Sequence, residues 1–245
     1  MSLLFGDNFK GKTDLTGKSY AFYRLFNSNS KLVSTQNLSL PAETLADYCY
    51  CDMFSGCTGL TTAPTLPATT LAIRCYYQMF QGCTSLVTAP SVLPATTLAS
   101  NCYNQMFDGC TKLVNAPTLS ATTLANYCYI SMFRGCTSLT TAPTLPATTL
   151  AFYCYGYMFF GCTSLETAPT LPATTLTYSC YSSMFDGCSL LNYIKCLATD
   201  ISATNCTSSW LNGVFATGTF VKNAKMESWT TGTSGIPSGW TAVTE

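Results

Sequence analysis

The stretch that decides the fold is residues 132–165, MFRGCTSLTTAPTLPATTLAFYCYGYMFFGCTSL. It returns to its own beginning after 26 residues, and its cysteines follow the spacing Cys-x7-Cys. The Gly-Cys pair recurs every 26 or 27 residues, at Cys57, Cys83, Cys110, Cys136, Cys162 and Cys188. A fixed period of this length predicts a solenoid of stacked units, because one short unit buries too little apolar surface to offset the entropy of ordering it.

Two degenerate copies of the repeat flank these six complete copies. Residues 21–29 align with the repeat without either cysteine, and Cys206 with Val214 continues the frame downstream. End repeats depart from the consensus because one face of each lacks a neighbouring repeat. We therefore predict a solenoid of about eight repeats at residues 19–214, with its first and last repeats degenerate. Residues 1–18 are predicted to be an N-terminal cap or the remnant of a preceding domain, and residues 215–245 a C-terminal β-rich cap.

The predicted cap contains two short strands, at residues 218–222 and 236–243, joined by a turn rich in Gly, Ser and Thr. Such short β-rich runs bounded by turn residues are typical of strands. We expect them to cover the open end of the last coil, with Trp229 or Trp240 packed against it.

The first part of each repeat has the pattern of a short strand. Residues 139–142, Leu-Thr-Thr-Ala, place apolar side chains at the spacing of an inward-facing strand, and Leu145 follows at the corner. Pro143 ends the strand, because proline cannot donate to a ladder that is flanked on both sides. We expect three or four paired residues per coil, forming a parallel sheet across the stack.

The second part of each repeat has the spacing of a helix. Cys154, Met158 and Cys162 stand at i, i+4 and i+8, which is one face of a helix, and Gly161 is a typical stop signal. The sequence therefore predicts a short α or 3-10 helix within residues 151–160 of this repeat and at the same place in the others.

The repeat resembles the bacterial BspA-like leucine-rich repeats, whose units combine Gly-Cys-x-x-Leu, an apolar strand, a Leu-Pro or Ile-Pro pair, a helix and a final Gly-Cys. Leu139, Leu145-Pro146, Met158-Phe159 and Gly161-Cys162 occupy the corresponding places, and the match covers about residues 19–214. The resemblance implies an α/β repeat solenoid, a right-handed leucine-rich-repeat coil with one short strand and one short helix per repeat. It also implies a cell-surface protein that acts in adhesion.

The fifteen cysteines could be buried free thiols that fill the core, partners in disulfide bonds, or metal ligands. Thiols eight residues apart on one helix lie about 12 Å apart along its axis, whereas a disulfide needs Cα atoms within about 7 Å. The chain has no histidine and no Cys-x2-Cys pair, so a metal site is disfavoured. Buried free thiols are favoured, with some disulfides as the alternative. Cys51, Cys196 and Cys206 stand outside the regular pairs, and we expect these thiols to be the more exposed.

Composition excludes several classes of function. Only 9% of residues are charged and the formal net charge is zero, which disfavours nucleic-acid binding. No run of 18 apolar residues is present, so no membrane insertion is expected. Without histidine, paired carboxylates or a phosphate-binding loop, we expect no enzyme activity and no cofactor. The start lacks a secretory signal, and we expect Met1 to be an internal start within a longer exported chain.

The repeats separate constant scaffold positions from variable positions, and the variable positions are expected to face outward on the helical side. The candidate binding surface consists of the variable aromatic residues Tyr127, Tyr153, Tyr157, Phe160 and Tyr178. A constant tyrosine column, which includes Tyr50 and Tyr129, is expected to cover the seam between helices with its hydroxyl groups in water. The exposed threonine pairs are interpreted as a soluble β face.

Two functions fit this surface. The first is a recognition or adhesion module that presents an extended repeat surface to a protein or glycan partner. The second is a purely structural spacer or assembly scaffold within a larger surface or phage-associated protein. A third hypothesis, a cytosolic scaffold, is suggested by the thiols if they are reduced. We expect a monomer, secreted or located at a cell surface.

Overall fold

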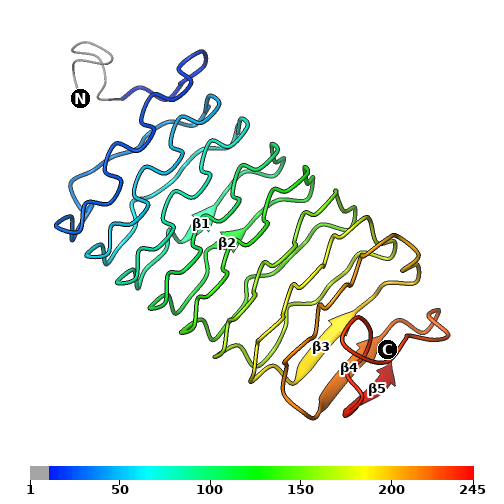
Figure 1. Ribbon diagram of the computed structural model, residues 1–245. Helices are drawn as coiled ribbons and strands as arrows, with labels where there is room; N and C mark the ends of the chain where they lie inside the picture. Colours follow the sequence, from blue (N-terminus) through cyan, green and yellow to red (C-terminus); the bar gives the residue numbers. More distant parts are fainter. Residues whose placement is uncertain (1–10) are drawn as a thin grey trace.

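The computed structural model describes residues 11–245 and is an elongated stack of coils (Figure 1). Equivalent positions of successive coils lie side by side and are linked by parallel bridges, as in Thr44 with Thr70 and Asn115 with Thr141. The chain is therefore a repeat solenoid. The first ten residues of the predicted N-terminal segment, residues 1–18, lie outside the described residues.

One side of every coil is a series of overlapping β-turns, here called the turn chain, which covers residues 153–161 in the repeat quoted above. Every second N–H closes a turn within the coil: Met158 N–H donates to the Tyr155 carbonyl oxygen at 3.2 Å. The N–H groups between them donate to the next coil, as Phe159 N–H does to the Met184 carbonyl oxygen at 2.8 Å. The turn chain is therefore half bonded to itself and half to its neighbour.

Positive φ angles recur every four residues along the turn chain, at Tyr153 (53°), Tyr157 (54°) and Gly161 (70°). A type II turn requires positive φ at its third residue, so type II turns alternate with turns that lack it. The described residues contain eight turn chains, which begin at Tyr20, Tyr48, Arg74, Asn101, Tyr127, Tyr153, Ser179 and Asn205.

The predicted helix at residues 151–160 is wrong, because no helix occurs within residues 11–245. The same residues accordingly include no apolar helix that could cross a bilayer. The pattern Cys154, Met158, Cys162 has the period of the turn chain, which is four residues. Three such positions do not distinguish a period of four from the 3.6 residues of a helical turn.

The strand side of the coils is more interrupted than the sequence predicts. Paired strands occur at β1 (Val92–Leu93) and β2 (Thr118–Leu119), which are parallel and in register. Elsewhere this side contains isolated parallel bridges, such as Thr62 with Thr88. Proline stands two residues after this bridging position in five coils and has no N–H to donate, which limits pairing to one or two residues.

The C-terminal end has the most extensive sheet. Strands β3 (Tyr193–Cys196), β4 (Gly218–Lys222) and β5 (Trp240–Thr244) pair in parallel in the order β3-β4-β5. Lys195 in β3 occupies the position that is proline in the five preceding coils, at Pro64, Pro90, Pro117, Pro143 and Pro169. The longer strand is thus found in the coil from which this proline is absent. The bounds of β4 agree with the predicted strand at residues 218–222.

Two columns of stacked aromatic rings fill the core. The first passes from Phe22 through six tyrosines to Trp210 and Trp229, with neighbouring ring centroids 5.2 to 6.2 Å apart. The six are Tyr50, Tyr76, Tyr103, Tyr129, Tyr155 and Tyr181. Phenylalanines from Phe26 to Phe185 form the second column. The expectation that the tyrosine hydroxyls lie in water is wrong, since these side chains are buried and the Tyr103 and Tyr181 hydroxyls have no hydrogen-bond partner.

All fifteen cysteines are free and buried. The expectation that Cys51, Cys196 and Cys206 are exposed is wrong, because all three are buried. Burial raises the pKa of the Cys83 thiol to about 12, and the Cys128 thiol has the same shift for the same reason. These sulfur atoms are packed with leucine, methionine and aromatic side chains, so they belong to the core.

Candidate functional site

The turn chain sorts its side chains in pairs. In residues 152–160, Cys154, Tyr155, Met158 and Phe159 are buried in the core, whereas Phe152, Tyr153, Tyr157 and Phe160 are only partly buried and lie on the outside. This inside-outside alternation has the four-residue period of the positive φ angles. The variable positions of the repeat therefore face outward, as predicted, although they stand on turns.

The structure brings the five candidate residues together with one further ring, Phe152. These six residues, Tyr127, Phe152, Tyr153, Tyr157, Phe160 and Tyr178, are called the aromatic patch. Their rings form a continuous series of contacts across three successive coils. Centroid distances are 5.9 Å for Tyr127–Tyr153, 6.3 Å for Tyr153–Tyr157 and 5.9 Å for Tyr157–Phe160.

Phe152 connects the two ends of the aromatic patch. Its ring lies 5.1 Å from that of Tyr127 in an edge-to-face arrangement and 4.9 Å from that of Tyr178 in a stacked arrangement. Tyr178 is 44% exposed. Edge-to-face and offset-stacked pairs are favourable ring arrangements, so the patch is held in place by its own contacts.

Gly156 makes room for the Tyr153 ring. A Cβ atom at position 156 would lie 2.4 Å from two carbon atoms of that ring, closer than real Cβ atoms approach. The seven equivalents of Gly156 in the other coils all carry side chains: Tyr23, Cys51, Tyr77, Asn104, Ile130, Ser182 and Ser208. The glycine therefore lets Tyr153 lie flat over the backbone beside Tyr157. Burial raises the pKa of the Tyr153 hydroxyl, and the nearby Tyr157 adds to the rise.

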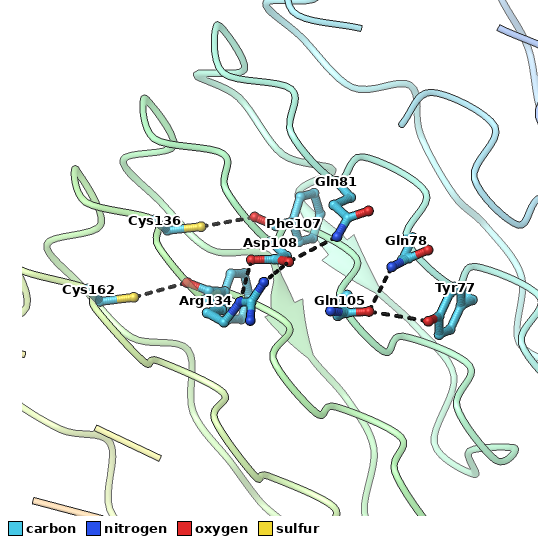
Figure 2. A network of polar contacts seen from close by, with 10 residues as sticks. Tyr77, Gln78, Gln81, Gln105, Phe107, Asp108, Arg134, Cys136 and Cys162 are labelled. Atoms are coloured by element: carbon cyan, nitrogen blue, oxygen red, sulfur yellow. Dashed lines mark hydrogen bonds and ion pairs between the residues drawn. The ribbon is translucent and has the colours of Figure 1, made fainter. Parts of the chain in front are cut away.

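A polar ladder lies on the same outer face, in the two coils that precede the aromatic patch and in the first coil of the patch (Figure 2). It consists of Gln81, Asp108 and Arg134. Arg134 donates twice to Asp108, through Nε at 2.9 Å and Nη2 at 3.0 Å, and Gln81 Nε2 donates to Oδ2 at 3.0 Å. Asp108 is buried, so this bidentate pair satisfies its charge. The ladder links three coils and leaves no free charge.

Sequence reasoning missed a second aromatic group on the outer face, in the first three coils. Tyr20, Tyr48, Arg74 and Tyr77, here called the Tyr-Arg cluster, occupy the same repeat positions as Tyr127, Tyr153 and Gly156. The Tyr20 and Tyr48 rings stack with centroids 4.7 Å apart. Comparison of the repeat columns indicates this cluster, because Tyr48 and Arg74 stand in the same variable column as Tyr127 and Tyr153.

Neither the family models nor the curated proteins include a match to this sequence. Two solved structures are similar, and both are leucine-rich repeat proteins. One is from T. pallidum, with 16% identity, a TM-score of 0.42, and coverage of 79% of this chain and 77% of that chain. The other is from Bacteroides ovatus, with 16% identity, a TM-score of 0.35, and coverage of 89% of this chain and 70% of that chain.

Proposed function

We propose that the chain is a non-enzymatic recognition module that binds a protein or glycan partner along the outer face of its turn chains. The aromatic patch carries this proposal, because six rings from three coils contact one another outside the core. Clustered exposed aromatic residues mark interaction sites, since tyrosine supplies a large contact area at a small cost in conformational entropy.

The scaffold favours binding by many contacts along a rigid surface. Backbone groups in the turn chain are committed to turns and to the next coil, so side chains are left to contact a partner. Each coil adds about 4.8 Å along the stack, the usual strand spacing. A ligand that spans several coils would gain from several weak contacts at once.

The same proposal places the chain in a BspA-like family of adhesion proteins and at a cell surface. The support is the Gly-Cys-x-x-Leu and Leu-Pro frame of residues 132–165. Antibody labelling of intact source cells tests this part. Surface fluorescence is expected, and signal seen only after cell lysis would contradict it.

The repeats themselves supply compatible replacements for testing the aromatic patch. Equivalent positions contain Asn101, Ser183 and Asn212, so Tyr153→Asn, Tyr157→Ser and Phe160→Asn are compatible with the turn chain. The triple variant and the parent chain would be applied to an array of neutral and anionic glycans and to an array of purified cell-surface proteins. A matched control carries Asn205→Ser and Asn212→Ser, on the same outer face but outside the aromatic patch and the Tyr-Arg cluster; serine occupies the equivalent positions at Ser179 and Ser55.

We expect the parent chain to bind at least one probe, the triple variant to lose that binding, and the control to keep it. All three proteins should melt at similar temperatures. Unchanged binding by the triple variant would refute the role of the aromatic patch. If the parent binds no probe on either array, the spacer function is favoured instead.

A further inference from the structure

The chain has three arginines, and they differ in how their charge is satisfied. Arg24 pairs with Asp52 at 3.3 Å and Arg134 pairs with Asp108 at 2.9 Å. Arg74 has no carboxylate oxygen within 4.0 Å among residues 11–245. Asp47, on the preceding coil, instead accepts a hydrogen bond from the Ile73 N–H at 2.9 Å. Arg74 is therefore the one arginine without an ionic partner, and all three arginines lie within the described part of the chain.

Two tyrosine rings hold the Arg74 guanidinium in place. Its central carbon lies 5.5 Å from the ring centroid of Tyr48 and 5.5 Å from that of Tyr77. Nη1 donates a hydrogen bond to the Tyr48 hydroxyl at 3.0 Å. An arginine has five N–H donors in a fixed fork, so most of the donors of Arg74 remain for a ligand. Contact with the rings fixes the fork before any ligand arrives.

An exposed aromatic surface lies next to this fork. Tyr20 stacks on Tyr48 with an interplanar angle of 13°, and the Tyr20 side chain is 54% exposed. Tyr77 donates through its hydroxyl to Gln105 Oε1 at 3.3 Å, and Gln78 Nε2 donates to the same atom at 2.8 Å (Figure 2). The cluster thus combines an unpaired cation, an aromatic surface and fixed amide groups.

We propose that the Tyr-Arg cluster binds an anionic sugar residue of a glycan chain. The carboxylate or sulfate of the sugar would accept two hydrogen bonds from Arg74, and the apolar face of the ring would contact Tyr20. Bidentate pairing with carboxylates and with tetrahedral oxyanions is the chemistry that arginine supplies and lysine does not. This inference rests on the proposed function and assigns the anionic part of the ligand to one end of the outer face.

The backbone of this face favours a glycan over an acidic peptide, because its N–H groups already donate hydrogen bonds within the coil or to the next coil. Tyr77 N–H closes a turn to the Arg74 carbonyl oxygen at 3.2 Å, and Gln78 N–H donates to the next coil at 2.9 Å. An extended peptide that added a strand would need free backbone groups, which this face does not offer. Asn101 and Asn104, between the Tyr-Arg cluster and the aromatic patch, supply amide groups that can bind sugar hydroxyls.

The test uses the full chain with five polymers as probes: polygalacturonate, dextran sulfate, dextran, pullulan and poly-glutamate. Arg74→Asn is the central variant, because Asn101 and Asn205 occupy the same column with positive φ. Arg134→Asn is the control that removes an ion-paired arginine from the same face. Affinity is measured by titration at low and at moderate salt.

We expect the parent chain to bind polygalacturonate, dextran sulfate or both, and Arg74→Asn to weaken this binding about tenfold or more, the value of one charge-assisted pair. Arg134→Asn should change it by less than about twofold. The two anionic polysaccharides distinguish a carboxylate from a sulfate. If parent and variant both bind at low salt and both lose binding at moderate salt, the result would indicate non-specific electrostatic attraction and would overturn the site.

Three other results would overturn the inference. They are no binding to either anionic polysaccharide, equal binding by parent and Arg74→Asn, and Arg74-dependent binding of poly-glutamate in preference to the polysaccharides. If parent and Arg74→Asn bind the anionic polysaccharides equally, while the triple variant of the aromatic patch loses binding to dextran or pullulan, the proposed function stands and the anionic site fails. The two claims can therefore be separated.

Discussion

The Cys136 thiol donates a hydrogen bond to the carbonyl oxygen of Phe107 in the preceding coil, with Sγ 3.2 Å from the oxygen. The same bond occurs at the second cysteine of five other coils, between Sγ and the oxygens of Phe26, Phe54, Phe80, Phe133 and Phe159, at 3.0 to 3.1 Å. The second cysteine column therefore links coils through a donor as well as by packing. The first column has longer contacts, as in Cys128 Sγ to the Cys154 oxygen at 4.0 Å.

This difference predicts unequal effects of serine in the two columns. A serine hydroxyl at position 136 has the Phe107 oxygen as its acceptor, whereas a hydroxyl at position 128 is buried without a close partner. An unsatisfied buried hydroxyl costs about 1 to 3 kcal/mol. We expect Cys128→Ser to lower the urea midpoint more than Cys136→Ser does. Equal midpoints would show that the thiol contact at Cys136 contributes nothing specific.

Positive φ in the turn chain predicts opposite effects of glycine and alanine. Gly161 has φ of 70°, and its alanine variant should lose about 1 kcal/mol because Cβ clashes with the backbone in this conformation. Ser209 has φ of 52°, so Ser209→Gly should be neutral or stabilising by a comparable amount. Chemical denaturation measures both. A stabilising Gly161→Ala would contradict the turn geometry.

The buried Tyr103 hydroxyl predicts a stabilising substitution. It has no hydrogen-bond partner, so Tyr103→Phe removes an unsatisfied group while the ring keeps its place in the column. We expect a gain of about 1 kcal/mol. The reverse change in the second column, Phe107→Tyr, should destabilise the chain. Melting temperatures of the two variants give the comparison, and a less stable Tyr103→Phe would indicate that the hydroxyl does have a partner.

The buried thiols predict a loss of stability at alkaline pH. Burial raises the pKa of Cys49, Cys83 and Cys188 from 9.0 to about 12. Above pH 9 the unfolded chain loses thiol protons that the folded chain keeps, so stability falls as pH rises between about 9 and 12. Each thiol contributes up to about 1.4 kcal/mol per pH unit. Denaturation midpoints between pH 7 and pH 10.5 test this, and a flat profile would contradict burial of the thiols.

Much of the architecture follows from the period of the sequence, but the local backbone does not. The Gly-Cys register places equivalent residues in adjacent coils, and the prolines typified by Pro143 indicate where strand pairing stops. The spacing of Cys154 and Met158 predicts a helix at the place of the turn chain, because it fits both structures. Half of its hydrogen bonds join neighbouring coils, so no local propensity could distinguish the two.

The candidate surface could be predicted in part, because the repeat allows equivalent positions to be compared. Variation among repeats identified Tyr127, Tyr153, Tyr157, Phe160 and Tyr178 as outward positions, and the structure places their rings in one patch. Gly156 makes room for the Tyr153 ring, and the position of that ring is known only from the structure. The tyrosine column of Tyr50 looked similar in sequence, but its neighbours in the stack bury it.

Counting reactive thiols before and after unfolding tests most directly whether stacked coils bury the cysteines as free thiols. The full chain is treated with a thiol reagent in native buffer and, separately, in denaturant without reductant, and intact mass is measured. We predict no labelling of the native chain and fifteen labels on the denatured chain, since all fifteen cysteines are free and buried. Labels on the native chain, or fewer than fifteen after denaturation, would contradict the stacked-coil account.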